Sequence, residues 1–244
     1  MRRPAPAPTT PEARIRTHLQ TLKLTRMAAE LDPVLAQAAR DNLPLTHVLE
    51  RLLATETQAL LARRIERRIK ESKLPERKLL SDFDFDFQTG IDQRQILELA
   101  TLGFVERRQG LIIGGNSGTG KSHIAKAILL LACEKNYRCR YVTASAMLKD
   151  LLAGLADSSL DRKLKKYLSP ELLLIDEIGF DRLEQEEASH RNASLFHKVI
   201  DGRYCKGSTI ATTNIDFQAL GDYLGDPVIT TALVDRMVHH SIII

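Results

Sequence analysis

Two different spacings of apolar residues divide the chain into an N-terminal and a C-terminal part. Over residues 12–72 the apolar positions recur at helical intervals, which predicts amphipathic helices. Pro33 and Pro44 punctuate this pattern, so we expect a small all-helical domain over residues 12–78. Residues 1–11 are rich in proline and predict a flexible extended tail. The helical positions are Leu19, Leu22, Leu24, Met27, Leu31, Val48, Leu49, Leu52, Leu53, Leu60, Leu61, Ile65 and Ile69.

After Gly90, short apolar runs alternate with amphipathic stretches. Four runs are typical of strands, and they cover residues 111–113, 140–143, 172–175 and 209–212. The stretches between them predict helices near residues 121–135, 145–168 and 188–205. Because such alternation gives a mostly parallel sheet with helices on both faces, we predict an α/β domain over residues 91–244.

A linker over residues 79–90 joins the two predicted domains. In it, Phe83, Phe85 and Phe87 alternate with aspartates at the period of an extended strand, which gives one apolar and one acidic face. We expect the apolar face to dock onto the following domain. Ordinary packing is the favoured role of these rings, and direct contact with a nucleotide or a neighbouring subunit is the alternative.

The composition is that of an ordinary folded protein, because 43% of the 244 residues are hydrophobic and 27% are charged. The longest apolar stretch, residues 127–133, is far shorter than the ~20 residues that cross a bilayer. The N-terminus also lacks an apolar signal region, so we expect a cytoplasmic protein without membrane contact. The three cysteines have no C-x-x-C spacing, which favours buried reduced thiols over disulfides or a zinc site.

Charge is distributed unevenly along the chain. Residues 1–80 contain 16 Lys and Arg against 9 Asp and Glu, whereas residues 81–244 contain 19 against 22. The basic N-terminal third therefore points to a nucleic acid or an acidic protein as its partner.

The segment Gly115-Asn116-Ser117-Gly118-Thr119-Gly120-Lys121-Ser122 fits the phosphate-loop pattern G-x-x-x-x-G-K-[ST]. It follows a predicted strand and opens a predicted helix, which argues against an ordinary glycine-rich turn. Its glycines let backbone N–H groups face a phosphate, and the N-terminus of the helix adds partial positive charge. We predict that Lys121 reaches the β- and γ-phosphates of ATP and that Ser122 binds Mg²⁺, with His123 completing the nucleotide-binding set.

Three further positions complete a predicted hydrolytic site. Asp176 and Glu177 end a buried strand, where Asp176 would support Mg²⁺ and Glu177 would orient the attacking water. Asn214 follows another strand and could hydrogen-bond the γ-phosphate, although a helix N-cap is its alternative role. Arg236 could act as an arginine finger on a neighbouring subunit, and a solvated helix arginine is the alternative.

With these motifs, the sequence resembles the IstB-like helper ATPases of insertion-sequence transposition, which are AAA+ proteins related to the DnaC helicase loader. The resemblance covers nearly the whole chain. The residues that carry it are Phe83-Asp-Phe85, Gly-Thr-Gly-Lys-Ser-His123, Leu-Leu-Ile-Asp-Glu-Ile-Gly179, Arg203-Tyr204, Thr213-Asn214 and Asp-Arg-Met-Val-His-His240.

The resemblance implies that Asn214 is the sensor 1 residue and that Arg236 is the trans-acting finger. Arg203 could be a second intersubunit arginine, and a role within its own subunit is the alternative. The sequence departs from the family pattern in two places. Ser122 stands where relatives often have Thr, a change that keeps the metal-binding hydroxyl. The apolar run that reaches Ile244 predicts the start of a strand. Relatives usually continue beyond this point, so a sensor 2 arginine, which the family pattern would include, cannot be assigned here.

Two basic segments are candidates for contact with double-stranded DNA. The first contains Arg63, Arg64, Arg67, Arg68 and Lys70, and the second contains Arg162, Lys163, Lys165 and Lys166. On helices these side chains form rows that suit a phosphate backbone. The alternative is a solvated helix with Glu66–Lys70 and Arg67–Glu71 pairs. Neither segment has a base-reading signature, so we expect sequence-tolerant contacts.

Together, these features and the resemblance predict an ATP-dependent DNA-binding ATPase that assists the transposase of an insertion sequence. Subunits would assemble through ATP-bridged interfaces, with Mg²⁺ as cofactor and target DNA and the cognate transposase as partners. A helicase loader with the same ATPase core is the nearest alternative. A small-molecule kinase is disfavoured, because Asp176, Glu177 and Arg236 suit hydrolysis between subunits.

Overall fold

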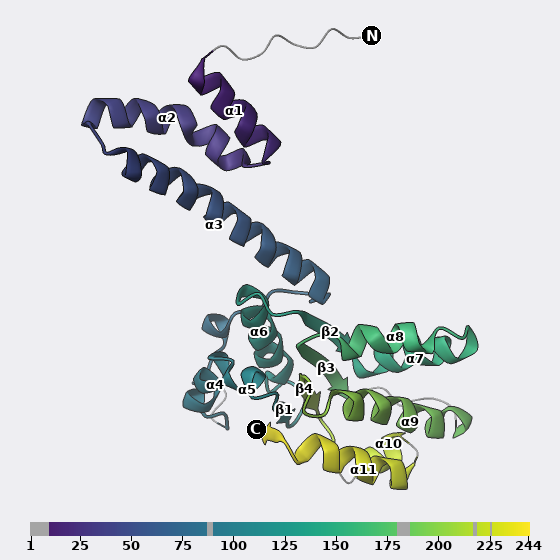
Figure 1. Ribbon diagram of the computed structural model, residues 1–244. Helices are drawn as coiled ribbons and strands as arrows, with labels where there is room; N and C mark the ends of the chain where they lie inside the picture. Colours follow the sequence, from purple (N-terminus) through teal and green to yellow (C-terminus); the bar gives the residue numbers. More distant parts are fainter. Residues whose placement is uncertain (1–9, 87–89, 180–185, 217–218, 225) are drawn as a thin grey trace. The chain divides into compact units, whose positions relative to one another are not determined.

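The computed structural model describes residues 10–86, 90–179, 186–216, 219–224 and 226–244, and its chain forms two compact units, Met1–Glu66 and Arg67–Ile244 (Figure 1). Residues 67–78, which the sequence predicts in the helical domain, belong to the second unit. Within that unit Ile69 and Ser72 are buried, Arg68 donates a hydrogen bond to Asn136 at 3.2 Å, and Glu76 pairs with Lys126 at 3.1 Å. Among the described residues, no helix is long and apolar enough to span a membrane.

The first unit is helical, as predicted. It consists of α1 (Pro11–Thr21), α2 (Thr25–Asp41) and most of α3 (Leu45–Ser72). Its core is formed by Leu19, Leu31, Val34, Val48 and Leu52. The other leucines that the helical spacing includes on α3 are exposed, because they face away from this core: Leu49, Leu53, Leu60 and Leu61.

Pro33 does not end a helix, contrary to the prediction, because α2 continues through it. The neighbouring residues Leu31 and Val34 are buried, and this burial outweighs the one backbone hydrogen bond that a proline removes.

Glu56 on α3 caps the N-terminus of α2. Its buried carboxylate accepts hydrogen bonds from the backbone N–H groups of Arg26 and Met27 at 2.8 and 2.9 Å. These are N–H groups that a helix start leaves without an intrahelical partner. Arg63 pairs with the same carboxylate at 3.2 Å, so it has a structural role within the first unit.

The second unit is the predicted α/β domain. Its strands are β1 (Gly110–Gly114), β2 (Cys139–Thr143), β3 (Leu172–Ile178), β4 (Ser208–Thr213) and β5 (Ser241–Ile243). Its helices are η1 (Leu80–Asp82), α4 (Gln93–Ala100), α5 (Gly103–Glu106), α6 (Lys121–Glu134), α7 (Ala144–Ala156), α8 (Leu160–Leu168), α9 (Glu186–Arg203), α10 (Leu220–Leu224) and α11 (Pro227–Val238). The strand order is β2-β3-β4-β1-β5, and every pair is parallel.

Helices cover both faces of the sheet (Figure 1). Ile112, Val142, Leu173 and Ala211 lie on one face in a core shared with α7, α9 and α11. Because side chains alternate along a strand, the strand residues next to these four point to the other face of the sheet, which α6 covers. This sandwich brings the carboxyl ends of β1, β3 and β4 to one edge, where the predicted phosphate loop and acids lie.

The structure refines two local predictions. The helix expected over residues 145–168 is two helices, because Ser158 has a left-handed backbone with φ +56° and Asp157 accepts a hydrogen bond from the Ser159 N–H at 3.0 Å. The strand expected at the C-terminal apolar run is confirmed as β5, which pairs with β1.

The linker is not an extended strand as predicted. It forms the 3-10 turn η1, after which Phe83 and Phe85 contact each other edge to face with ring centroids 4.8 Å apart. In an extended strand, residues i and i+2 are spaced farther apart than the 4.8 Å between these two ring centroids. Phe87 lies outside the described residues.

Candidate functional site

The phosphate loop has the backbone that its glycines predict. It runs from the end of β1 to Lys121, the first residue of α6, and Gly115, Gly118 and Gly120 have φ values of +141°, +81° and +86°. These are conformations that side-chain-bearing residues rarely adopt. The ammonium of Lys121 donates a hydrogen bond to the carbonyl of Asn116 at 2.5 Å. Burial lowers the pKa of Lys121, and the nearby Asp176 carboxylate opposes that shift.

Next to the loop is a cleft of about 320 Å³. Its walls contain most of the predicted nucleotide-binding residues together with Glu177 and Asn214. The lining residues are Ser117, Gly118, Gly120, Lys121, Ser122, His123, Glu177, Thr212, Thr213 and Asn214. Gly115, Asn116 and Thr119 belong to the same loop without lining the cleft.

Asp176 lies fully buried beside the cleft and accepts three side-chain hydrogen bonds. Ser122 and Thr212 donate to its Oδ1 at 2.8 and 2.5 Å, and Tyr141 donates to its Oδ2 at 3.2 Å. Burial and this carboxylate raise the pKa of Tyr141, so the phenol remains a hydrogen-bond donor. The ammonium of Lys126 lies 3.8 Å from the same Oδ2. A hydroxyl and a carboxylate oxygen in contact are ligands that suit Mg²⁺.

Glu177 is presented to the cleft by a β-bulge. The pairing of β3 with β4 shifts register between Ile175 and Ile178, and Glu177 has φ +62°. Bulges of this kind redirect a side chain. The backbone N–H of Glu177 donates to Thr212 Oγ1 at 2.9 Å, while its side chain is exposed at the cleft. The geometry gives the two adjacent acids different environments, one buried and one accessible.

Asn214 does not cap a helix. It follows β4 and lines the cleft, whereas the next helix, α10, begins at Leu220. The N-cap alternative is therefore wrong, and Asn214 lies at the cleft beside the phosphate loop.

The linker packs on the phosphate loop. His123 Nε2 lies 2.8 Å from the carbonyl oxygen of Leu79, and the rings of Phe83 and His123 are 5.5 Å apart. Phe83 also covers Gly120, where a Cβ atom would lie 2.4 Å from the phenyl ring. Gly120 is thus required both by its positive φ and by this contact.

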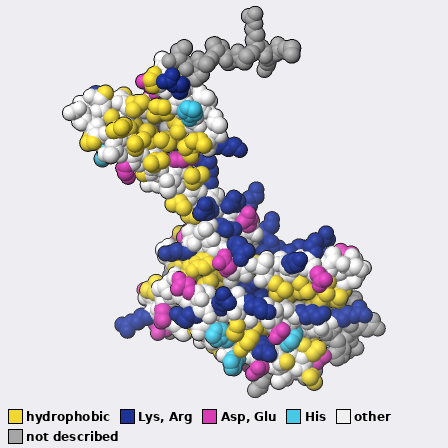
Figure 2. Space-filling model, in the orientation of Figure 1, with side chains coloured by type: hydrophobic (Ala, Val, Ile, Leu, Met, Phe, Trp, Pro, Cys, Tyr) yellow, Lys and Arg dark blue, Asp and Glu magenta, His cyan; other side chains and the backbone are white. Residues whose placement is uncertain are grey.

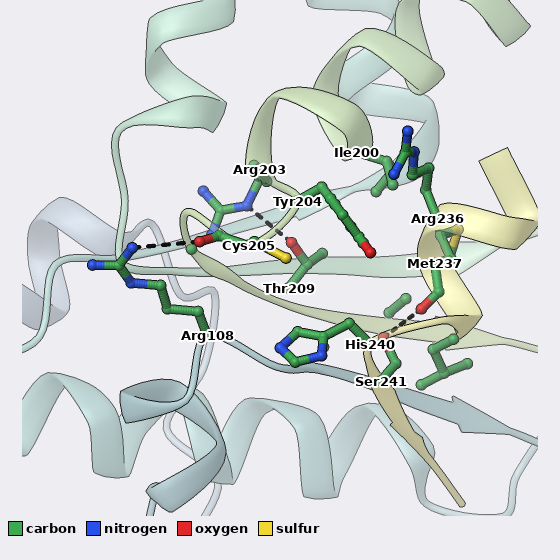
Figure 3. Close-up of a pocket in the computed structure, with 14 residues that line it drawn as sticks. Arg108, Ile200, Arg203, Tyr204, Cys205, Thr209, Arg236, Met237, His240 and Ser241 are labelled. Atoms are coloured by element: carbon green, nitrogen blue, oxygen red, sulfur yellow. Dashed lines mark hydrogen bonds between the residues drawn. The ribbon is translucent and has the colours of Figure 1, made fainter. Parts of the chain in front are cut away.

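Arg236 lies on a separate pocket and does not line the cleft (Figure 3). Its guanidinium stacks on the Tyr204 ring, 4.6 Å from the centroid, and its Nε lies 3.6 Å from Asp201. The Tyr204 hydroxyl is 2.9 Å from His239 Nδ1, which fixes the ring. Arg236 remains 43% exposed, so it is accessible from outside the subunit.

Arg203 is a structural residue and not the intersubunit arginine that the resemblance suggests. It is 1% exposed, and its guanidinium donates to Thr209 Oγ1 (Figure 3). It also donates to the carbonyl oxygens of Tyr167, Pro170 and Ser208. Burial lowers its pKa to about 10. A side chain with these partners has no group left for a neighbouring subunit.

The structure pairs several members of the predicted basic segments with acids. Arg67 and Arg68 lie 3.9 and 3.4 Å from Glu71, and Lys163 and Lys166 lie 3.7 and 3.0 Å from Asp150. The Arg67–Glu71 pair is one of the two expected for a solvated helix. The exposed members of the two segments include Arg64, Lys70, Arg162 and Lys165.

Sequence reasoning did not find Tyr141, Thr212 and Lys126, which surround Asp176. The sequence predicts the strands that contain Tyr141 and Thr212, but only the structure shows that these strands flank β3 in the sheet. Their roles depend on strand order and register, which the chain pattern leaves open.

The site combines a phosphate loop after one strand of a parallel sheet with a buried aspartate and an adjacent exposed glutamate in another strand. This combination defines a P-loop ATPase of the AAA+ class. Solved structures with this fold include DnaI, with a TM-score of 0.55 at 21% identity over 69% of this chain and 90% of that one. AMPPCP-bound DnaA from Aquifex aeolicus gives 0.52 at 20% identity over 68% and 49%. At these identities the likeness concerns the fold alone.

The chain belongs to the family described as IstB-like ATP binding protein, whose profile matches residues 17–244. One relative, the insertion sequence IS5376 putative ATP-binding protein of Geobacillus stearothermophilus, is 36% identical over 94% of this chain and 90% of its own length. Another, the IS21 putative ATP-binding protein of Pseudomonas aeruginosa, is 35% identical over 91% and 82%.

Proposed function

We propose that this protein hydrolyses ATP to control its assembly on double-stranded DNA, and that the assembled form assists the transposase of an insertion sequence. The observation that carries the ATPase part is the contact between Ser122 and the buried Asp176 beside a cleft that also contains Lys121, Glu177 and Asn214. The DNA and transposase parts are supported by relatives named as insertion-sequence proteins and by the exposed basic side chains.

In this mechanism each cleft residue has a separate task. Lys121 neutralises charge on the β- and γ-phosphates, and Asn214 donates a hydrogen bond to the γ-phosphate. Glu177 accepts a proton from the attacking water, for which its exposed position at the cleft is suited. Ser122 and Asp176 would hold Mg²⁺, which when bound offsets charge on the phosphates.

Arg236 is proposed to act on the ATP of a neighbouring subunit. It lines a pocket other than its own cleft and is exposed, which supports a role in trans. In such a role the guanidinium stabilises charge that develops on the γ-phosphate. Assembly and hydrolysis would then require the same contact, so that hydrolysis limits the lifetime of the assembly.

The first experiment measures DNA binding, particle size and ATP hydrolysis with ATP, ADP or no nucleotide. We expect ATP to drive assembly on DNA and Lys121→Ala to abolish it. Glu177→Gln should reduce hydrolysis by about 10²–10⁴-fold and prolong the assembly. If nucleotide changes neither particle size nor DNA binding, the proposal is wrong, and co-purification with a replicative helicase would then favour the loader function.

Mixing two inactive variants tests the trans role of Arg236. A subunit with Arg236→Ala keeps an intact cleft, and one with Glu177→Gln keeps an intact Arg236. Equal mixing should restore roughly a quarter of the wild-type rate, because one interface in four then pairs an intact cleft with an intact finger. No recovery in mixed particles of normal size would contradict an arginine acting between subunits.

A further inference from the structure

A further cavity, of about 260 Å³, opens at the start of the edge strand β2. Its walls come from the last turns of α3, the start of β2 and the end of α8. They contain four cationic side chains, Arg68, Arg138, Arg140 and Lys166, against the single carboxylate of Glu71. The fold therefore brings one member of each predicted basic segment to the same cavity, beside two arginines that belong to neither.

The acids around this cavity do not satisfy all of its donors. Arg138 lies 3.4 Å from Glu171, Arg68 lies 3.4 Å from Glu71, and Lys166 lies 3.0 Å from Asp150. Arg140 has no such partner in the described part of the chain, and its Nε is buried without a hydrogen-bond acceptor there. A buried N–H of a charged group is costly to leave unpaired, so the site favours an anionic acceptor.

The chemistry of the walls favours phosphate as that acceptor. Guanidinium groups present N–H donors in a planar fork that matches phosphate oxygens. The exposed Arg162 also lies one turn before Lys166 on α8, on the same face of that helix. Figure 2 shows Lys and Arg side chains distributed widely over the side of the second unit that is in view. A pocket of four cations with another cation one helical turn away suits a chain of phosphates better than one isolated ion.

We propose that Arg68, Arg138, Arg140 and Lys166 form a pocket that binds phosphate groups of the DNA backbone. This inference rests on the proposed DNA binding and names its contact. It joins the two basic segments into one surface through residues of β2, and it places the DNA contact at the opposite end of β2 from Thr143, which pairs with Asp176.

The test is the salt dependence of the affinity for a mixed-sequence DNA duplex, measured with the full chain and ATP. Loss of one phosphate contact flattens the slope of log affinity against log salt by about 0.9. For Arg140→Gln the ratio of wild-type to variant affinity should therefore shrink about 3-fold between 50 and 200 mM salt. Arg138→Gln, at a more exposed position, should behave alike and keeps the test valid if Arg140→Gln fails to fold.

Two controls vary charge in other ways. Arg94→Gln removes an exposed charge on α4, away from the pocket, and should leave the slope and ATP hydrolysis unchanged. Glu71→Gln removes the carboxylate of the pocket and should raise DNA affinity, because Arg68 loses its competing partner.

The outcomes separate this inference from the proposed function. If the wild type shows no ATP-dependent DNA binding, the proposed function fails. If the wild type binds but Arg138→Gln and Arg140→Gln keep its full slope, the pocket does not contact DNA and the inference is overturned. If inorganic phosphate at constant ionic strength raises the unfolding midpoint of the wild type alone while DNA slopes stay equal, the pocket is a free-anion site and the inference is again overturned.

Discussion

Replacing Thr212 by valine removes a single hydroxyl that serves both acids of the ATP site. This hydroxyl donates to Asp176 at 2.5 Å and accepts from the backbone N–H of Glu177 at 2.9 Å. Thr212 is 1% exposed, so water cannot replace the lost partner easily. Valine has nearly the same shape, and the change therefore removes two hydrogen bonds without opening a cavity.

The magnitude follows from these two bonds. A hydrogen bond to a buried charged group contributes about 1.5–3 kcal/mol, and a buried N–H left unpaired costs about 1–3 kcal/mol. Allowing for relaxation, we expect the free energy of unfolding to fall by about 2–4 kcal/mol. Each kcal/mol lowers Tm by roughly 2–4 °C for a unit of this size. The kcat for ATP hydrolysis should fall by about 10-fold or more, because Glu177 loses the bond that holds its left-handed backbone.

The assay is urea unfolding followed by circular dichroism, with kcat measured on the same preparations. Thr212→Ser keeps the hydroxyl and should retain most of the activity. Thr101→Val removes an exposed hydroxyl that bonds only nearby backbone groups, those of Glu98 and Gly103, where water can replace it, and should alter the free energy of unfolding by about 1 kcal/mol or less. Equal stability and equal kcat for Thr212→Val and Thr212→Ser would refute the role of this hydroxyl.

Three further predictions concern other parts of the second unit. Arg203→Lys should lower the free energy of unfolding by about 3 kcal/mol or more, because a buried cation loses most of its carbonyl partners; normal stability in urea with lost assembly would instead indicate an interface residue. Gly120→Ala should weaken ATP binding at least 10-fold in a titration with a fluorescent ATP analogue, because the added Cβ would collide with Phe83 and the φ of residue 120 is +86°. Adding Phe83→Ala to Gly120→Ala removes the collision but not the strained φ, so it should restore binding only in part. The hydrogen bond from Lys126 lowers the pKa of Glu76 from 4.5, so the pair stabilises the fold above that pH and the contribution fades as the pH falls through the lowered pKa. Glu76→Gln should therefore make the unfolding midpoint less pH-dependent below about pH 4.5, and an unchanged pH profile would contradict this account.

The phosphate loop could be predicted from the sequence because everything it needs is contiguous. Its glycine φ values, the preceding strand and the first turn of α6 are all local consequences of residues 110–134. The alternation of strands and helices likewise predicted the parallel sheet, since buried strands have a distinctive run of apolar residues.

The surroundings of Asp176 could not be predicted in the same way. Its three donors come from α6, β2 and β4, and strand order alone decides that β2 and β4 flank β3. The bulge that presents Glu177 is a register shift between two strands, and no local residue pattern announces it.

Arg203 shows why a motif does not fix the role of a residue. Its neighbours in sequence gave a family resemblance, but its partners are carbonyl groups at Tyr167, Pro170 and Ser208. Only the packing of α8 and the start of β4 around the end of α9 brings these acceptors together. The same holds for Leu49 and Leu53 on α3, whose helical spacing was correct although the core lies on another face.

The strand β2 connects the ATP site with the proposed phosphate pocket. Side chains alternate along a strand, so Tyr141 faces Asp176 while its neighbour Arg140 lines the pocket. Both residues are held by the same pairing, Arg140 opposite Leu173 and Tyr141 opposite Leu174. A change at Asp176 when nucleotide binds would act on the edge strand that carries Arg140, without any intervening loop. We propose that ATP and DNA binding are coupled through these adjacent residues. Tyr141→Phe should then reduce the difference in DNA affinity between the ATP and ADP states, and an unchanged difference would contradict this route.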